Sequence, residues 1–418
     1  MIEITGNGGQ NVKDTRRRWL AIAAVMFGVG WGANQFASLL IAYHQKRGLT
    51  ISVNEALFGI YALGLVPALI LGGPASDRWG RRRVVRPAAV MSVVATLVLM
   101  VGAHSTPLLF LGRFLAGTAS GGVMAAGTAW VKELSVPPYD LTAGEQSGAR
   151  RAAIALSAGF GLGPLVAGLI AEWGPLPLVV SYVPHLAVMA LVLPGLWRVP
   201  ETVNHAAGLG PSLAARMRVP AAGHPRFLSI VSPLAPWVFG SASVSFAVLP
   251  SIVSDRTRGF GIAFAGLIAV LTLGVGVLVQ PVARRLDRLD SSRGAVAGLT
   301  LVAVGMLVAA WAAGLDNPLV VVAAGAVLGA GYGFCLVAGL LEVQRIANPD
   351  ELAGLDAVFY GLAYVGFAFP VALAELSRFT SFTVLLLCLA GVVAVCLTVV
   401  ASYSRKPYGM SERAWDAP

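Results

Sequence analysis

Charged residues are scarce in this sequence. They make up 12 % of its 418 residues, whereas 57 % are hydrophobic. A soluble domain carries roughly 25 % charged residues, so this composition excludes an ordinary soluble enzyme and predicts a membrane protein. The formal net charge is +10, which in a soluble protein would suggest nucleic acid. Loop topology at a membrane surface explains it better here, so no nucleic-acid partner is expected.

Cysteine is also scarce. The three cysteines, Cys335, Cys388 and Cys396, all lie inside apolar runs. An odd number in such positions argues against a disulfide framework and against a metal site, so no metal or cofactor is expected. The sequence contains no phosphate-binding loop of the Walker type and no catalytic constellation. Neither enzymatic activity nor ATP-driven transport by this chain alone is therefore expected.

Long apolar runs fill most of the chain. A transmembrane helix needs about 20 apolar residues. By that measure we predict an all-α membrane protein whose twelve helices lie in the lipid bilayer, at roughly 19–43, 52–73, 84–104, 106–132, 148–173, 176–198, 226–250, 258–281, 293–314, 318–343, 353–376 and 380–403. The first run is too long for the hydrophobic region of a signal peptide, so we expect helix 1 to be a retained anchor.

The twelve runs divide into two sets of six. Helix 7 begins about 207 residues after helix 1, and Pro370 in helix 11 follows Pro164 in helix 5 at nearly that offset. Two six-helix repeats are typical of transporters that rock around a central site; unrelated helices with similar spacing are the alternative. We predict a first half at 1–198, a cytoplasmic linker at 199–225, a second half at 226–403 and a cytoplasmic tail at 404–418.

Lysine and arginine are distributed unevenly between the predicted loops. The side that carries both termini holds 24 of the 30. The other side holds Lys46, Arg47, Arg256, Arg258 and Arg378, and Arg113 lies within helix 4. By the positive-inside rule both termini are cytoplasmic. We expect a multi-pass protein of the plasma (inner) membrane.

The turn after helix 2 carries the most specific motif. Residues 73–83 read Gly-Pro-Ala-Ser-Asp-Arg-Trp-Gly-Arg-Arg-Arg and form a predicted charged loop between two spans. This resembles the loop 2–3 signature of the major facilitator superfamily, G-x-L-a-D-R-x-G-R-K. The residues that match are Gly73, Asp77, Arg78, Gly80, Arg81 and Arg82. The resemblance covers nearly the whole chain and implies a twelve-helix transporter for a small molecule.

The residues of this turn can also be interpreted individually. We expect Gly73 to allow close packing of helix 2 and Gly80 to permit the tight turn. Asp77, at a membrane boundary, needs a partner such as Arg81 or the positive end of a helix. The resemblance implies a conformational latch between the halves, with residues 354–356 at the start of helix 11 as its counterpart. The alternative is that these charges only enforce topology.

Helix 5 contains a second motif, at residues 159–168. It resembles the G-x-x-x-G-P-x-x-G-G motif of antiporters that export drugs and metabolites; the matching residues are Gly159, Gly163, Pro164 and Gly168. Gly159 and Gly163 would line a groove for close helix approach, and Pro164 would kink the helix. The resemblance therefore favours export over uptake. Small-residue patterns in membrane helices are common, so packing alone is the alternative.

Arg113 is a charge inside helix 4, in a segment that resembles the superfamily's helix 4 motif, whose arginine is implicated in proton coupling. It lies about seven residues from the outer end of its span, or roughly 10 Å deep. We expect it at the cavity wall near a polar stripe on helix 1, because such a charge normally faces the interior; snorkelling to the surface is the alternative. The stripe is Trp31, Asn34, Gln35 and Ser38.

Other candidates are weaker. Aromatic and hydroxyl side chains suit an apolar pocket that still orients a substrate. In the second half these are Trp237, Ser241, Ser245, Tyr332, Tyr360 and Tyr364. His185 is a titratable residue in the middle of helix 6 that could exchange protons, although a hydrogen-bonded core histidine is the alternative. No carboxylate is evident at mid-membrane.

Together these patterns predict a monomeric secondary transporter that exports a small apolar or amphiphilic molecule in exchange for protons. An uptake symporter or facilitator for a metabolite is the first alternative. A membrane receptor or scaffold that kept the fold without transporting is the second.

Overall fold

The computed structural model describes residues 18–144, 147–203, 219–286, 292–348 and 351–404. Most of the predicted linker and nearly all of the predicted tail lie outside the described residues. Twelve helices are long and apolar enough to cross a membrane, and no strand occurs in the described part. The predicted all-α membrane fold with twelve spans is therefore confirmed.

The first six spans are built from eight helices. Spans 1 and 6 are each broken into two pieces, and span 3 ends in a short 3-10 turn, η1 (Gly102–His104). The helices are α2 (Arg18–Asn34), α3 (Phe36–Arg47), α4 (Ile51–Trp79), α5 (Arg81–Val101), α6 (Thr106–Glu133), α7 (Ser147–Trp173), α8 (Pro177–Val180) and α9 (Val183–Arg198).

The last six spans contain more interruptions. Span 7 alternates π and α geometry through η4 (Phe227–Val231), α11 (Ser232–Ser243), η5 (Val244–Val248) and α12 (Leu249–Ile252), after a short turn η3 (Pro220–Gly223). The remaining elements are α13 (Gly261–Leu278), α14 (Gln280–Leu286), α15 (Arg293–Leu315), α16 (Pro318–Ile346), α17 (Leu352–Tyr364), η6 (Val365–Phe367), α18 (Ala368–Leu376) and α19 (Phe382–Tyr403).

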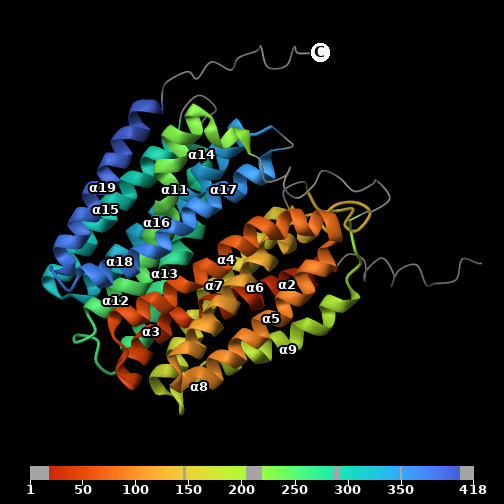
Figure 1. Ribbon diagram of the computed structural model, residues 1–418. Helices are drawn as coiled ribbons and strands as arrows, with labels where there is room; N and C mark the ends of the chain where they lie inside the picture. Colours follow the sequence, from red (N-terminus) through yellow and green to blue (C-terminus); the bar gives the residue numbers. More distant parts are fainter. Residues whose placement is uncertain (1–17, 145–146, 204–218, 287–291, 349–350, 405–418) are drawn as a thin grey trace, which may run out of the picture.

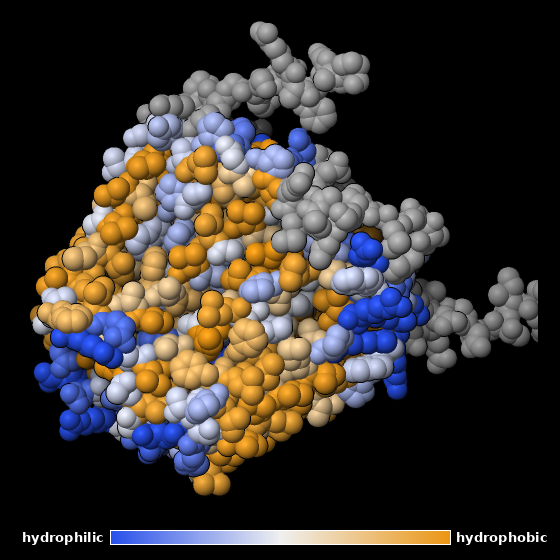
Figure 2. All heavy atoms as spheres, viewed as in Figure 1, coloured by the Kyte–Doolittle hydropathy of each residue, from blue (hydrophilic) through white to orange (hydrophobic). Residues whose placement is uncertain are grey.

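Two groups of six spans lie side by side, and Figure 1 shows the red-to-green first group beside the green-to-blue second group. Because the number of spans is even, the described ends Arg18 and Ser404 lie on one side of the membrane, which we call the terminal face. The other side is the opposite face. Figure 2 shows apolar residues along the flanks and hydrophilic residues gathered at the two ends, as a bilayer-spanning protein requires.

Small residues let helices within each group approach closely. In the first group a Cβ on Gly117 would collide with the Tyr61 carbonyl, where α6 crosses α4. In the second group a Cβ on Gly333 would collide with the Gly276 carbonyl, where α16 crosses α13. Small residues at such crossings are how membrane helices gain packing without a hydrophobic driving force.

The predicted charged loop at 73–83 is wrong in its extent. Helix α4 continues through Asp77 to Trp79, and α5 begins at Arg81. The chain turns at Gly80 alone, whose φ of 99° lies in the region that favours glycine. Gly72, and not Gly73, allows the close packing that was expected of helix 2. A Cβ on Gly73 would meet nothing within 4 Å, whereas one on Gly72 would lie 3.2 Å from Ala125.

Candidate transport site

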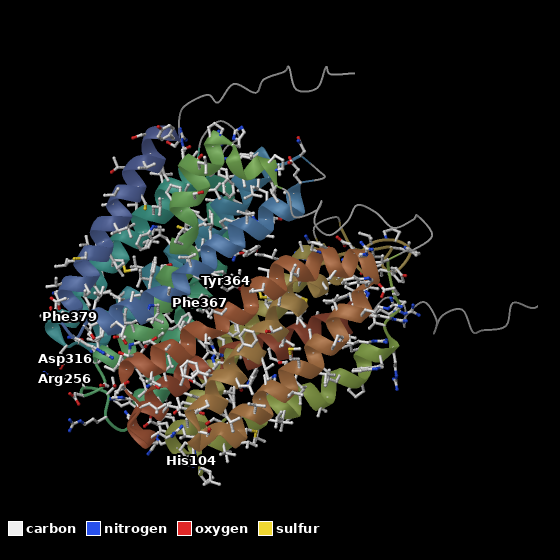
Figure 3. The ribbon with its side chains drawn as sticks, in the orientation of Figure 1. His104, Arg256, Asp316, Tyr364, Phe367 and Phe379 are labelled. Atoms are coloured by element: carbon white, nitrogen blue, oxygen red, sulfur yellow. The ribbon has the colours of Figure 1, made fainter. Side chains whose placement is uncertain are left out.

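Aromatic side chains gather where the two groups of spans meet at mid-depth. We call this set the central cluster: Phe58, Tyr61, Phe239, Phe246, Tyr364 and Phe367. Phe367 stacks on Phe58 with ring centroids 5.0 Å apart, and Tyr364 stacks on Phe239 at 4.4 Å. The Tyr364 hydroxyl donates to Met124 Sδ of α6 over 3.7 Å. Figure 3 shows Tyr364 and Phe367 between the two groups.

Arg113 lies beside this cluster and is 1 % exposed. Its Nε donates to the Leu57 carbonyl at 3.1 Å and its Nη1 to the Ala33 carbonyl at 2.9 Å. The guanidinium carbon lies 4.7 Å from the ring centres of both Phe36 and Tyr61. The side chain is therefore held inside the first group and does not reach the membrane surface.

The polar stripe predicted on helix 1 does not face a single cavity. Asn34 donates to the Phe160 carbonyl of α7 at 2.8 Å, and Gln35 donates to the Thr96 hydroxyl of α5 at 3.5 Å. Ser38 donates back to the Gln35 carbonyl. The break between α2 and α3 falls at Gln35. The stripe therefore ties span 1 to two different neighbours.

Trp31 also belongs to this packing. A Cβ on Gly159 would collide with the Phe27 carbonyl and lie 2.8 Å from the Trp31 nitrogen, and one on Gly163 would lie 2.6 Å from the Trp31 carbonyl. These two glycines of the helix 5 motif thus form the predicted groove, and the helix they accept is α2 of the same group.

The other end of the helix 5 motif contacts the second group. A Cβ on Gly168 would lie 2.8 Å from the Ile262 carbonyl, and one on Gly266 would lie 2.7 Å from the Pro164 carbonyl. Glu172, one turn further along α7, accepts from the backbone nitrogen of Ile262 at 2.6 Å. The motif therefore packs α7 between α2 and α13.

Substituting Gly159 should test this packing. Gly159→Ala places a methyl group against α2 backbone and should destabilise the protein by about 1–3 kcal/mol. Gly161→Ala, two residues away with nothing within 4 Å of the added carbon, should be neutral or stabilising by up to about 1 kcal/mol. Thermal unfolding in detergent measures both. Equal melting temperatures for the two variants would contradict the packing argument.

Residues predicted in the second half fall into two sets. Trp237 packs on Phe369 with ring centroids 5.1 Å apart, and Ser245 bonds the Thr272 hydroxyl at 2.7 Å. Ser241 donates back into its own helix. These three side chains pack within the second group.

The tyrosines of the second half lie closer to the interface between the groups. The Tyr332 ring lies 6.1 Å from Phe239, a member of the central cluster. Tyr360 lies within electrostatic reach of Tyr332 and Asp356, and Asp356 lies within reach of Lys132 on α6. Tyr332 and Tyr360 therefore extend the central cluster, of which Tyr364 is a member, toward the terminal face.

His185 is fully buried inside the first group. Its ring nitrogens lie 2.9 Å from the Thr96 hydroxyl and 3.4 Å from the Ser92 hydroxyl. A Cβ on Gly32 would lie 2.5 Å from the ring. His185 therefore lies in a hydrogen-bonded core position, which was the alternative to a role in proton exchange.

A network of charges joins three spans of the first group at the terminal face. Arg81 pairs with Asp77 at 2.5 Å and with Glu133 of α6 at 2.7 Å. Arg82 donates to the Val199 carbonyl at 2.8 Å. The motif residue Arg81 thus serves as the hub between α4, α5 and α6.

Glu201, which follows span 6, completes this network. It accepts from the backbone nitrogens of Arg81 and Arg82 at 2.9 and 3.0 Å and so caps the start of α5. Partial burial acts to raise the pKa of Glu201, but the backbone donors outweigh it and hold that pKa below its usual value. Thr202 donates to Glu133.

The second group has a comparable network at the same face. Glu342, near the end of α16, pairs with Arg226 at 2.5 Å and Arg345 at 2.6 Å and accepts from Ser292 at 2.6 Å. Glu133 is the last residue of α6, and Glu342 lies one turn before the end of α16. The guanidinium that pairs with Glu133 comes from α5, whereas those that pair with Glu342 come from the start of span 7 and from α16 itself. Arg284 and Arg285 lie in the last turn of α14.

Sequence reasoning missed one buried carboxylate. Glu55 lies one turn inside α4 and is 3 % exposed, and its Oε2 has no hydrogen-bond partner in the described part of the chain. An acidic residue inside a predicted apolar run was the available signal. Whether such a residue contacts water depends on the neighbouring helices, which the sequence alone does not place.

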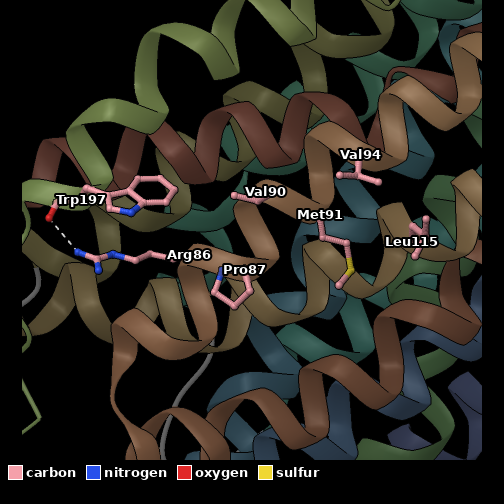
Figure 4. Close-up of a pocket in the computed structure, with 7 residues that line it drawn as sticks. All are labelled: Arg86, Pro87, Val90, Met91, Val94, Leu115 and Trp197. Atoms are coloured by element: carbon pink, nitrogen blue, oxygen red, sulfur yellow. Dashed lines mark hydrogen bonds between the residues drawn. The ribbon is translucent and has the colours of Figure 1, made fainter.

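A groove of about 470 Å³ lies elsewhere, on the outer surface of the first group (Figure 4). It is lined by Arg86, Pro87, Val90, Met91, Val94, Leu115 and Trp197. Arg86 donates to the Trp197 carbonyl at 2.8 Å at one end. Val90 and Val94 are more than two-fifths exposed, so the groove faces the surroundings of the helix bundle and not the interface between the groups.

The family model for the Major Facilitator Superfamily matches residues 20–371. The chain belongs to the Major Facilitator Superfamily. As a superfamily member with twelve candidate spans among its described residues, it is a multi-pass membrane protein. The matched region begins in span 1 and ends in span 11, so both groups of spans contribute to it.

Two curated superfamily proteins are similar over shorter regions. The glucose transporter GlcP of Staphylococcus epidermidis is 28 % identical over 123 residues, which are 28 % of this chain and 26 % of that protein. The uncharacterized MFS-type transporter MJ1560 of Methanocaldococcus jannaschii is 28 % identical over 176 residues, or 42 % of this chain and 43 % of that protein. The matches thus span less than half of either relative.

Solved structures resemble this superfamily member over nearly its whole length. A POT family transporter in complex with 5-aminolevulinic acid covers 93 % of this chain and 96 % of its own, with a TM-score of 0.75 and 14 % identity. The nucleoside transporter NupG (D323A mutant) covers 93 % and 99 %, with a TM-score of 0.71 and 13 % identity. At such identities the likeness shows the fold alone.

Proposed function

We propose that this superfamily member exports a small apolar or amphiphilic molecule in exchange for protons across the plasma membrane, as a monomer. The observation that carries the proposal is the central cluster. Its aromatic rings come from α4, α11, η5, α17 and η6 and so from both groups of spans. Stacked rings with a few hydroxyls suit an apolar ligand that must still be oriented.

The contacts between the two groups of spans support a conformation that is closed at the opposite face and open toward the terminal face. Glu172 caps the start of α13 at Ile262, and Arg378 donates to Ser52 at 2.9 Å, both toward the opposite face. If the termini are cytoplasmic, as the lysines and arginines indicate, this is a state closed to the outside. Rocking would break these contacts and open the central cluster to the outside.

Asp356 supports a preference for cationic amphiphiles. It lies within electrostatic reach of Tyr360, and one of its carboxyl oxygens is buried without a hydrogen-bond partner among the described residues. A carboxylate attracts a cation by its charge, and neighbouring aromatic rings add to that attraction. Asp356 lies near the start of α17, toward the terminal face.

Transport by purified protein in liposomes tests this function. With ethidium as a cationic amphiphilic probe, an imposed pH gradient should drive its movement opposite to the protons, several-fold faster than without the gradient. Collapsing the gradient with a protonophore should remove that acceleration. Ethidium movement that ignores the gradient in both directions would rule out proton exchange.

A second candidate is uptake of a small metabolite. The observation in its favour is the partial match to the glucose transporter GlcP of Staphylococcus epidermidis. Radiolabelled glucose in the same liposomes separates the two functions. Saturable glucose entry that unlabelled glucose inhibits and ethidium does not would replace export with uptake.

A further inference from the structure

Three residues on one face of α4 lie along the second group near the opposite face. Ser52 accepts from Arg378 at 2.9 Å, and a Cβ on Gly59 would lie 3.0 Å from Val371 of α18. Glu55 lies between them, three residues after Ser52 and four before Gly59, on the same side of the helix. We call this contact the α4–α18 seam.

Glu55 is almost completely enclosed at this seam. It is 3 % exposed, whereas the neighbouring acid Glu375 has a side chain that is 49 % exposed. Its Oε2 has no hydrogen-bond partner in the described part of the chain. An ionised carboxylate is strongly disfavoured in such surroundings, and a protonated one is tolerated.

Most of the surrounding charged and titratable groups already have other partners. Toward the opposite face, the charged and titratable groups on the elements packed against α4 are Tyr43, His44, Lys46 and Arg47 of α3, Arg113 of α6, and Glu375 and Arg378 at the end of span 11. Arg378 pairs with Glu375 at 3.2 Å, and Arg113 donates to two backbone carbonyls.

The groups on α3 are also engaged elsewhere. The Tyr43 hydroxyl bonds that of Tyr182 at 3.0 Å, His44 bonds the Leu49 carbonyl, and Arg47 donates to the His104 carbonyl. Lys46 is exposed. On α17, which also packs against α4, Asp356, Tyr360 and Tyr364 lie toward mid-depth and the terminal face. No described cation pairs with Glu55.

We propose that Glu55 is a proton-binding site of the α4–α18 seam. Its carboxylate takes a proton from water at the opposite face before the seam closes, and the resulting O–H bond persists while α18 covers it. When the seam opens, the proton returns to water on that same side. This proton is separate from the protons that the transporter exchanges for substrate.

The direction of the pH effect depends on which protonation state of Glu55 is stable in the closed seam and which is stable in the open seam. The closed seam accepts the neutral carboxyl, and the open seam exposes the group to water, where the ionised form is stable. Acid at the opposite face should therefore increase the closed population, and alkaline conditions should increase the open one. The inference rests on the alternating access in the proposed function and is independent of substrate and of proton exchange.

Spin labels across the opposite face can measure this equilibrium. Cysteines replacing Lys46 and Phe379, with the native cysteines changed to alanine, place one exposed label on each group of spans (Phe379 is labelled in Figure 3). In nanodiscs without substrate, the distance between labels should shift from long to short as the pH falls from about 8 to about 5, the range in which carboxyl groups with perturbed environments titrate. A distance that does not change with pH would overturn the proposal.

Variants of Glu55 identify the responsible group. Glu55→Gln imitates the protonated side chain and should give the short distance at every pH. Glu375→Gln, the matched control on an exposed acid of the same seam, should keep the pH dependence of the unsubstituted protein. A Glu55→Gln variant that titrates like the unsubstituted protein would overturn the assignment.

Folding and transport provide separate checks. If Glu55→Gln does not fold, Glu55→Asp decides: the shorter acid should shift the midpoint of the distance change, and an unchanged midpoint contradicts the proposal. The spin labels measure the opening of the opposite face without substrate and without a pH gradient. A distance that does not change with pH would therefore contradict the role of Glu55 and leave the proposed proton exchange unaffected. Likewise, ethidium transport that ignores the gradient leaves the seam titration unaffected.

Discussion

Replacing Arg113 with leucine should reduce transport by about two orders of magnitude. Arg113 donates to the carbonyls of Leu57 and Ala33 at 3.1 and 2.9 Å. Each buried carbonyl left without a donor costs about 1–3 kcal/mol, and every 1.4 kcal/mol changes an equilibrium about tenfold. Initial rates of transport in liposomes, normalised to inserted protein, measure the loss.

The reason for so large an effect is the break in span 1. Helix α2 ends at Asn34, so the Ala33 carbonyl belongs to its last turn, where backbone acceptors lack a full set of helical donors. Inside a bilayer no water can satisfy such a group. The guanidinium supplies the donor and places positive charge at the negative end of α2. Arg113 therefore holds the two pieces of span 1 against α4.

Lysine at this position provides the control. Arg113→Lys keeps a positive charge but lacks the planar fork that reaches two carbonyls on different helices. It should recover transport only in part, with a melting temperature between those of Arg113→Leu and the unsubstituted protein. Full activity in Arg113→Lys would assign the role to charge alone, and full activity in Arg113→Leu would remove Arg113 from the mechanism.

The span pattern and the depth of Arg113 were predictable from the sequence. Apolar run length determines how many helices cross the bilayer, and residue count along each helix determines depth. The structure accordingly places Arg113 beside Ala33, at the level predicted for Asn34. Periodicity also indicates which residues share a helix face, as for Gly159 and Gly163.

Periodicity could not predict which neighbouring helix a given helix face contacts. Gln35 and His185 both bond Thr96 within the first group, although the sequence placed Gln35 in the polar stripe of the cavity and left His185 open between proton exchange and a core position. Glu55 was missed for the same reason, because the face of α4 that carries it lies along α18, more than 300 residues away in the sequence. The packing of helices distant in sequence decides the environment of such side chains.

The second large expected effect concerns Asp77. Asp77→Asn should slow transport about tenfold or more while changing the free energy of unfolding by no more than about 1 kcal/mol. The pair with Arg81 is partly exposed, with the Asp77 side chain 36 % accessible, and such pairs contribute little to stability. Arg81 also keeps its bonds to Glu133 and Ser76.

Transport is affected because the charge acts in a different state. Asp77 lies at the end of α4 on the terminal face, and α17, which begins on that face, also packs on α4. When that face closes, the carboxylate would approach the start of α17, where exposed backbone N–H groups favour negative charge. A loss of about 1.4 kcal/mol in that state alone lowers its population tenfold.

The alternative, that these charges only enforce topology, makes the opposite prediction. The Asp77→Asn substitution leaves all the arginines after α4 in place, so orientation and transport would both be unchanged. Arg83→Gln is the matched control, since Arg83 is exposed in the first turn of α5 and its removal alters charge without touching Asp77. Slow transport in Asp77→Asn but not in Arg83→Gln, with both proteins correctly oriented, assigns a conformational role to the Asp77 carboxylate. Equal rates in the two variants would leave topology as the only function of this turn.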